Sequence, residues 1–228
     1  MKNIYSFLFI GIILSSLCTS CNLKPNNNLS NKIPSDSITT ANTDLKMFNI
    51  QGNVICFIEE HYDCDEDGHF EDKDYSFSTR YEFSTSGTLL RICNDYDYIE
   101  EFNYKTDKVQ RNELNQITNI TSQLSNSTYC YNSQGRIVST REDIFDEITC
   151  TLTTTNTYNQ NGDLTNSTIY GIVDGTNYQL TRDYTIIQRD KQNNWTLCIC
   201  QTIKDEEIHF DAIKRTIYYV GDEVPEIK

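Results

Sequence analysis

The sequence predicts an all-β protein: an antiparallel meander of about a dozen strands, twisted or rolled into an open half-barrel. Composition is the first reason, because 15 Tyr and 10 Phe, with abundant Thr and Ile, are typical of strands. The second reason is a seven-residue pattern: an aromatic residue or arginine, three residues, Gly or Asn, one residue, then a large apolar residue. Its copies occupy residues 83–89, 131–137, 158–164 and 189–195.

Each copy predicts the tip of a β-hairpin. A three-residue hairpin loop is usually a type I turn followed by a left-handed residue, and Ser133–Gly135 fit these positions. Gly135 suits the left-handed position because it has no Cβ, and Asn193 is a tolerant substitute in the last copy. This loop places Tyr131 opposite Ile137 on the two strands.

The same register pairs an aromatic with an aliphatic side chain in two further copies, and a cation with an aromatic ring in the last. The neighbouring pairs are polar, so we expect one apolar and one polar face on the sheet. The pairs in these three copies are Phe83–Leu89, Tyr158–Leu164 and Arg189–Trp195. A shorter version of the pattern, without glycine, occupies 104–109.

Strands are expected from the alternating apolar runs between these turns. Residues 112–124 combine helical spacing with strand-forming residue types, and we favour a strand or an irregular crossover there. The expected strands are 51–61, 74–83, 88–95, 98–104, 128–131, 136–143, 147–158, 163–170, 176–189, 195–204 and 209–220.

The N-terminus reads as an export signal followed by a tether. Residues 1–20 carry Lys2 and a short apolar run, which together are typical of a secretion signal. The run ends in Leu17-Cys-Thr-Ser-Cys21, which resembles the bacterial lipobox. That resemblance implies lipid attachment at Cys21 and membrane anchoring in a Gram-negative envelope, at the outer membrane. Leucine is usual where Cys18 stands, so ordinary secretion is the alternative. Residues 21–45 are polar and predict a flexible tether, and 46–228 predict the folded domain.

Charge and cysteine content restrict the function classes. The net charge of −14 repels phosphate backbones, so we expect no nucleic-acid partner. Seven cysteines follow Cys21, an odd number that cannot all pair within the chain. Most lie in strand-like runs and are expected to be free and buried, although one or two disulfides would suit an oxidising compartment.

The acidic stretch 63–74 is the candidate cofactor site. Its carboxylates at loop positions 1, 3, 5, 9 and 12, with glycine at 6, resemble a calcium-binding EF-hand loop. The alternative is a solvated hairpin tip that keeps sheet edges apart by like charge. By resemblance the calcium ligands are Asp63, Asp65, Asp67, His69 by its carbonyl, Glu71 through water, and Asp74.

We expect no enzyme. The chain has no nucleophile elbow, phosphate loop or dinucleotide motif. Adjacent carboxylates such as Glu59 and Glu60 point to opposite faces of a strand, and we expect both as surface charge. A hydrolase of unknown type is a minor alternative.

The segments 129–137 and 157–164 look like degenerate YD repeats of the RHS type, with matching tyrosine and glycine positions. The C-terminal segments Asn194-Trp-Thr and Lys214-Arg-Thr-Ile-Tyr-Tyr219 are similar to the ends of small RHS-like envelope lipoproteins of unknown function. This resemblance implies a β-hairpin array with no catalytic residues. The predicted function is therefore a lipid-anchored envelope module that binds a protein or glycan, or has a structural role, with a calcium-dependent binder as the more specific alternative.

Overall fold

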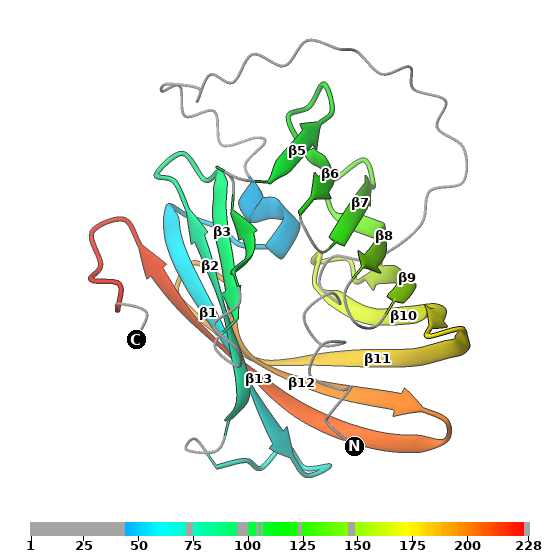
Figure 1. Cartoon of the computed structure of the whole chain (residues 1–228). Coiled ribbons are helices and arrows are strands. Elements are labelled where there is room, and N and C mark those ends of the chain that lie inside the picture. The colour runs from blue at the N-terminus through cyan, green and yellow to red at the C-terminus, as the bar shows by residue number, and fades with distance from the viewer. Residues whose placement is uncertain are drawn as a thin grey trace.

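The computed structural model describes residues 44–71, 75–94, 100–103, 105, 107–122, 125–145 and 149–225. These residues form one 13-stranded sheet and a short 3-10 helix, η2 (Asp44–Phe48) (Figure 1). The strands are β1 (Val54–Cys64), β2 (Tyr75–Phe83), β3 (Leu89–Asn94), β4 (Glu100–Asn103), β5 (Lys108–Arg111), β6 (Ile117–Thr121), β7 (Ser125–Tyr131), β8 (Ile137–Phe145), β9 (Thr149–Tyr158), β10 (Leu164–Val173), β11 (Thr176–Arg189), β12 (Trp195–Lys204) and β13 (Glu207–Tyr219).

The sheet is an antiparallel meander, as the sequence predicts. Its order is β4-β3-β2-β1-β13-β12-β11-β10-β9-β8-β7-β6-β5. Every neighbouring pair is consecutive in the chain except β1 and β13, which join the first strand to the last. The two edges of the sheet are therefore β4 and β5, which follow each other directly along the chain.

The sheet cannot close between β4 and β5, because it has an odd number of strands. Thirteen strands joined by antiparallel pairs leave the two edge strands running in the same direction. Parallel neighbours need a crossover of a dozen or more residues, whereas residues 104–107 alone connect these strands. The predicted open half-barrel is confirmed, and a seam between β4 and β5 is its consequence.

All four predicted hairpin tips have the expected geometry. Tyr131 is the strand partner of Ile137, and the other three predicted pairs are partners as well. Gly135 has a φ of 79° and donates its backbone amide to the carbonyl of Asn132 at 3.0 Å. Asn193 has a φ of 67° in the equivalent position. The left-handed conformation thus explains why Gly or Asn recurs there.

One hairpin tip was not among those predicted. Residues 111–117 follow the same pattern, with Arg111 first and Asn115, at a φ of 61°, in the left-handed position. Arg111 is the strand partner of Ile117, which begins β6. Residues 104–109, taken as a shortened tip, instead comprise the β4–β5 connection and the start of β5, and β4 and β5 are not strand partners. The preference for a strand within 112–124 is confirmed by β6.

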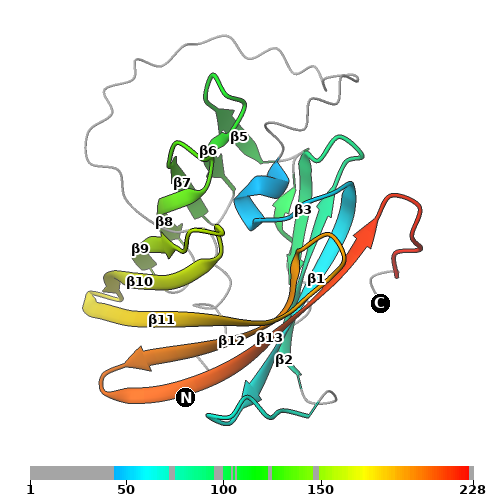
Figure 2. The same cartoon turned by 180° about the vertical axis from the view of Figure 1, so that it is seen from behind.

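Each of these five tips is followed by a one-residue slip in register. Beyond the Tyr131–Ile137 pair, for example, Cys130 pairs with Ser139, so Val138 has no partner. Such bulges bend a strand and increase its right-handed twist. Because all five lie just beyond the glycine or asparagine tips, they curl that rim of the sheet, as Figures 1 and 2 show.

Helix η2 lies inside the curl, between β3 and the β5–β7 side of the sheet (Figures 1 and 2). The Phe48 ring packs 5.4 Å from the Phe57 ring and 5.0 Å from the Tyr81 ring, measured between centroids. This core includes Leu89, Ile117 and Ile137 as well, so it joins strands from both sides of the seam. Asp44 and Leu45, which the predicted tether includes, are buried in it.

Candidate functional site

The acidic β1–β2 connection forms the same turn as the glycine tips. Asp65 Oδ1 accepts the backbone amides of Asp67 at 3.0 Å and His69 at 2.9 Å. Gly68, at a φ of 80°, donates its amide to the Asp65 carbonyl at 3.0 Å. Asn132 and Asp190 accept amides two and four residues ahead in their own tips in the same manner. Turn chemistry therefore accounts for an acidic residue at position 65 and for the glycine.

This turn determines where the predicted calcium ligands lie. The backbone amide of His69 lowers the pKa of the Asp65 carboxyl, and the His69 ring lies 3.2 Å from its second oxygen. The carbonyl of His69 accepts the Asp65 amide at 3.2 Å. Asp63 is in β1, Glu71 follows the turn, and Asp74 lies outside the described residues. Within the described ranges, no group of three or more His, Cys, Asp or Glu side chains is arranged to hold a metal ion. The calcium site stays a prediction.

The acidic connection folds back on the outer face of the sheet, the face that the curl does not enclose. The Phe70 ring lies 4.8 Å from the Tyr62 ring, and a Cβ on Gly68 would lie 3.1 Å from the Ile199 side chain. Ala212, the strand partner of both Tyr62 and Ile199, is fully buried. The outer face is therefore apolar here, which differs from the predicted polar face.

The hairpin tips are connected to one another along their rim. The hydroxyl of Tyr131 donates to the carbonyl of Ile117 at 2.6 Å, and that of Tyr158 donates to the carbonyl of Ile137, also at 2.6 Å. In each case the acceptor is the apolar residue that ends the preceding tip. This contact explains why two copies begin with tyrosine, since phenylalanine could not make it.

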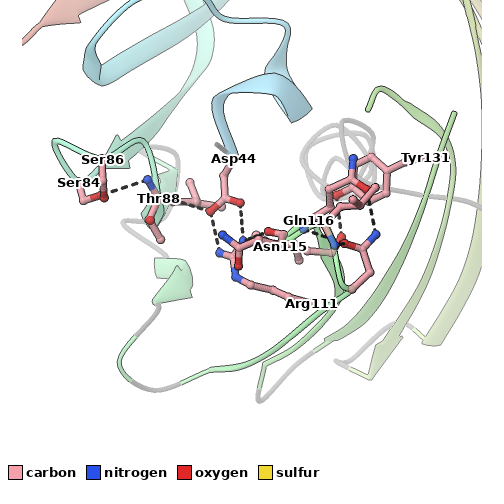
Figure 3. A network of polar contacts seen from close by, with 12 residues as sticks. Asp44, Ser84, Ser86, Thr88, Arg111, Asn115, Gln116 and Tyr131 are labelled. Carbon is pink, nitrogen blue, oxygen red and sulfur yellow. Dashed lines mark hydrogen bonds and ion pairs between the residues drawn. The ribbon is translucent and has the colours of Figure 1, made fainter. Parts of the chain in front are cut away.

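Asp44 connects the two sides of the seam (Figure 3). Its carboxylate accepts Arg111 Nη1 at 2.7 Å and Nη2 at 2.8 Å, and it accepts the Leu89 amide at 2.8 Å. The Asp44 amide donates to the Gly87 carbonyl at 3.1 Å, and Arg111 also donates to the Asn115 carbonyl at 2.7 Å. One buried carboxylate thus joins the tip at 83–89 to the tip at 111–117.

The inner face carries a buried ion pair that the sequence analysis did not find. Arg215 donates through Nε to Glu59 Oε1 at 3.0 Å and also through Nη2. Its guanidinium carbon lies 4.7 Å from the centre of the Phe57 ring and 3.6 Å from that of Trp195. The expectation of Glu59 as surface charge is wrong. Its side chain points to the same face of β1 as Phe57, which is the face that the curl encloses, and it is buried. The cation on Trp195 is likewise Arg215 and not Arg189, which lies 2.8 Å from Asp163.

Other inner-face groups have strongly shifted pKa values. Burial, together with the nearby Arg182 charge, lowers the pKa of His61 to about 3. Burial raises the pKa of Asp211 to about 6, against the opposing effect of Arg182. Burial also raises the pKa of Glu142 to about 7, although Ser127 donates to its Oε1 at 3.5 Å. These carboxyls titrate near neutral pH, which makes the fold sensitive to pH.

Five cysteines among the described residues carry free thiols, and burial raises the pKa of the buried ones to about 11 or above. Such thiols are poor nucleophiles. The free, mostly buried state agrees with the expectation for these residues: Cys56, Cys64, Cys150, Cys198 and Cys200. The predicted lipid site, Cys21, lies outside the described residues.

Exposed apolar side chains gather on the outer face, toward the rim opposite the glycine tips. Ile203 and Ile208 are strand partners on β12 and β13, with 37% and 53% of their surface exposed. Tyr170 and Ile172 of β10, and Phe145 at the end of β8, point to the same side by the alternation of the strands. We name these five residues the outer patch.

The comparisons with known proteins leave the family open. A scan against family models finds no match, and a search of curated proteins finds none either. Among solved structures, a porin-like protein from Bacteroides uniformis is similar at a TM-score of 0.31 and 11% identity, covering 74% of this chain and 99% of that one. Likeness at this level carries no argument about function. None of the helices in the described ranges has the length and apolar character needed to cross a bilayer.

Proposed function

We propose that this chain is a lipid-anchored protein of the Gram-negative cell envelope that binds another macromolecule without catalysis. The proposal of an anchor rests on the signal-like residues 1–20 and on Cys21 in its lipobox-like setting. The proposal of binding rests on one structural observation, the outer patch. Its members gather on one face of the sheet, with polar residues of β9 and β11 between them. Exposed apolar residues that gather on one face are typical of interaction surfaces, whereas single ones are not informative.

The place of the outer patch in the fold suits a tethered receptor. The described chain begins at Asp44, beside the rim of glycine tips. The outer patch lies toward the opposite rim, near the β10–β11 and β12–β13 turns (Figure 1). A flexible chain of the length from Cys21 to Asp44 spans roughly 25 Å on average. If residues 21–45 form the predicted tether, an anchor at Cys21 would join the fold at the rim opposite the outer patch and leave the patch accessible.

The composition of the outer patch favours a protein over a glycan. Sugar sites present aromatic rings, whereas three of the five exposed residues are isoleucine. Trp195, the only tryptophan, stacks on Arg215 instead of presenting an open ring. Calcium-dependent binding through 63–74 remains the second proposal, and its test is given in the Discussion.

Photo-crosslinking in living cells tests the binding proposal. A photoreactive amino acid is introduced at Ile208, and in a separate strain at Leu114, an exposed apolar residue in the tip at 111–117. We expect a discrete crosslinked adduct from position 208 and none from position 114. Absence of any adduct at 208, or an equal adduct at 114, would contradict the proposal. Replacement of Cys21 by Ser, followed by membrane fractionation, tests the anchor, and we expect release of the protein from the membrane fraction.

A further inference from the structure

The outer patch has a size that fits one helical segment. Ile208 is on β13 and Ile172 is on β10, three strand spacings away, and the register places the two four residues apart along the strands. At about 4.8 Å per spacing and 3.3 Å per residue, they lie roughly 20 Å apart along a diagonal of the sheet. An α-helix of about 16 residues is long enough to cover that distance. An amphipathic helix along this diagonal would place its apolar stripe over the isoleucines and Tyr170, with the polar Thr181 and Gln179 of β11 between them.

The turns beside the outer patch are acidic. Asp205, Glu206 and Glu207 are exposed at the β12–β13 turn, and Asp174 is exposed at the β10–β11 turn. Asp205 and Glu206 both adopt positive φ, 49° and 69°, which directs a tight turn beside the Ile203–Ile208 pair. The basic Lys204 nearby lies over the Tyr178 ring at 4.8 Å. The rim of the sheet beside the outer patch is thus negative at both of these turns.

This arrangement determines the charge of the occupant. Anionic lipid headgroups and nucleic acid would meet like charge at these turns, and a second copy of the chain would bring the same carboxylates against them. A partner with Lys or Arg beside its apolar stripe would instead be attracted, and would satisfy both parts of the surface.

We infer that the outer patch docks a cationic amphipathic peptide segment, with apolar side chains on Ile203, Ile208, Ile172 and Tyr170 and basic side chains at the acidic turns. This inference rests on the proposed binding function and adds the chemistry of the partner. The partner segment lies across the strands, so that several hairpins contribute to one interface.

Binding of designed peptides to the full chain carrying Cys21→Ser tests the inference. The probe is a fluorescent 16-residue helix of about that length with leucine on one face and lysine on the other. Control peptides replace lysine by glutamate, or scramble the order to abolish the stripe. We expect binding of the lysine peptide that weakens steeply with salt, and at least tenfold weaker binding of both controls.

Matched protein variants locate the site. We expect Ile203→Thr with Ile208→Thr to weaken the lysine peptide at least tenfold, and Leu114→Thr, which removes an equally exposed apolar side chain elsewhere, to leave it unchanged. Asp205→Asn, Glu206→Gln and Glu207→Gln together should flatten the salt dependence, whereas Asp222→Asn with Glu223→Gln should not. Circular dichroism confirms that each variant is folded.

The outcomes separate this inference from the binding proposal. Equal affinity for the glutamate peptide, no effect of the patch variants, or binding of lipid vesicles in place of the peptide would overturn the cationic partner. A crosslinked adduct at Ile208 without peptide binding would overturn this inference alone. Failure of both experiments would overturn the binding function as well.

Discussion

The carboxylate of Asp44 accepts both terminal nitrogens of the Arg111 guanidinium, at 2.7 and 2.8 Å. The same carboxylate accepts the Leu89 amide at the start of β3, while Arg111 ends β5. Strand pairing cannot cross the seam because β4 and β5 run in the same direction and their connection, 104–107, is too short for a parallel crossover. A residue that precedes the first strand therefore supplies a polar connection that the sheet itself cannot make.

Removal of this connection should destabilise the whole domain. Asp44 is 3% exposed, so Asp44→Ala leaves the Arg111 charge and the Leu89 amide without their acceptor. Breaking a buried ion pair costs roughly 3–5 kcal/mol, and we expect a loss in that range in urea unfolding. Arg141→Ala, which breaks the more exposed pair with Asp143, should cost less than about 1 kcal/mol. Similar losses in the two variants would contradict the role of Asp44.

The tyrosine hydroxyls at the tips should contribute separately. Tyr131→Phe and Tyr158→Phe each remove one hydrogen bond to a carbonyl and keep the ring. We expect each to lower the free energy of unfolding by about 1 kcal/mol, while Tyr170→Phe, at an exposed position, should change it little. If all three behave alike, the contact between successive tips contributes nothing measurable.

Gly162 is constrained both by its conformation and by its neighbour. Its φ is 92°, and a Cβ there would lie 1.8 Å from an Arg136 guanidinium nitrogen. Gly175 has a φ of 76° with no atom within 4 Å of such a Cβ, so it isolates the cost of the backbone conformation. We expect Gly175→Ala to cost about 1 kcal/mol and Gly162→Ala to cost more, because Arg136 must also leave the Tyr158 ring, 5.7 Å away. Thermal unfolding of the two variants measures the difference.

The free energy of unfolding should decrease as the pH rises from acid to neutral, because the buried Glu142 loses its proton. Its pKa rises from 4.5 in the unfolded chain to about 7 in the fold, so the folded state binds the proton more tightly. The stabilisation is fully present below pH 4.5 and is lost as pH rises through 7, by roughly 3 kcal/mol. Asp211 acts in the same direction, with a pKa raised to about 6, whereas His61 opposes it by favouring higher pH.

Urea unfolding at pH 5 and pH 8 tests this dependence. We expect Glu142→Gln to remove most of the part that Glu142 contributes to the difference in unfolding free energy between the two pH values, because the glutamine side chain does not titrate. Glu207→Gln, at an exposed position, should keep the wild-type difference. An unchanged pH dependence in Glu142→Gln would show that the buried carboxyl does not titrate in this range.

The calcium hypothesis can be separated from the turn. Asp65→Ser should retain the turn, because Ser84 accepts the Thr88 amide in the equivalent tip, at 3.1 Å. If 63–74 binds calcium, millimolar calcium will raise the melting temperature of the wild type and not that of Asp65→Ser. If the connection is only a solvated acidic tip, isothermal titration will show no heat for either protein. Asp65→Ala, which loses the amide acceptor, should melt lower than Asp65→Ser without calcium.

Much of the fold could be predicted, because hairpin chemistry is local. The left-handed residue at Gly135 or Asn193 is specified within a few residues, and it sets the register of the strands beside it. The tip at 111–117 obeys the same rule, and its Arg111 and Asn115 match the first and fifth positions of the tip at 189–195. Its signal was present in the sequence and was obscured by the helical spacing of its neighbours.

The candidate sites were less predictable, because they depend on distant partners. The spacing of Asp65, Asp67 and Gly68 fits a metal loop and a hairpin turn equally well. The contacts with His69 show the turn, and calcium binding stays a prediction. The outer patch brings together residues of four strands, and single exposed isoleucines have no signature along the chain. Glu59 likewise reads as surface charge until Arg215, 156 positions away, is placed beside it.

By itself the sequence determined that the chain folds as successive antiparallel hairpins, because turn conformation and side-chain alternation act over a few residues. The tertiary structure alone decided that the last strand pairs with the first, that the sheet stays open at β4 and β5, and that Asp44 joins the two sides. The reason is that the curl is the sum of many small twists and bulges, and which distant residues meet depends on that sum.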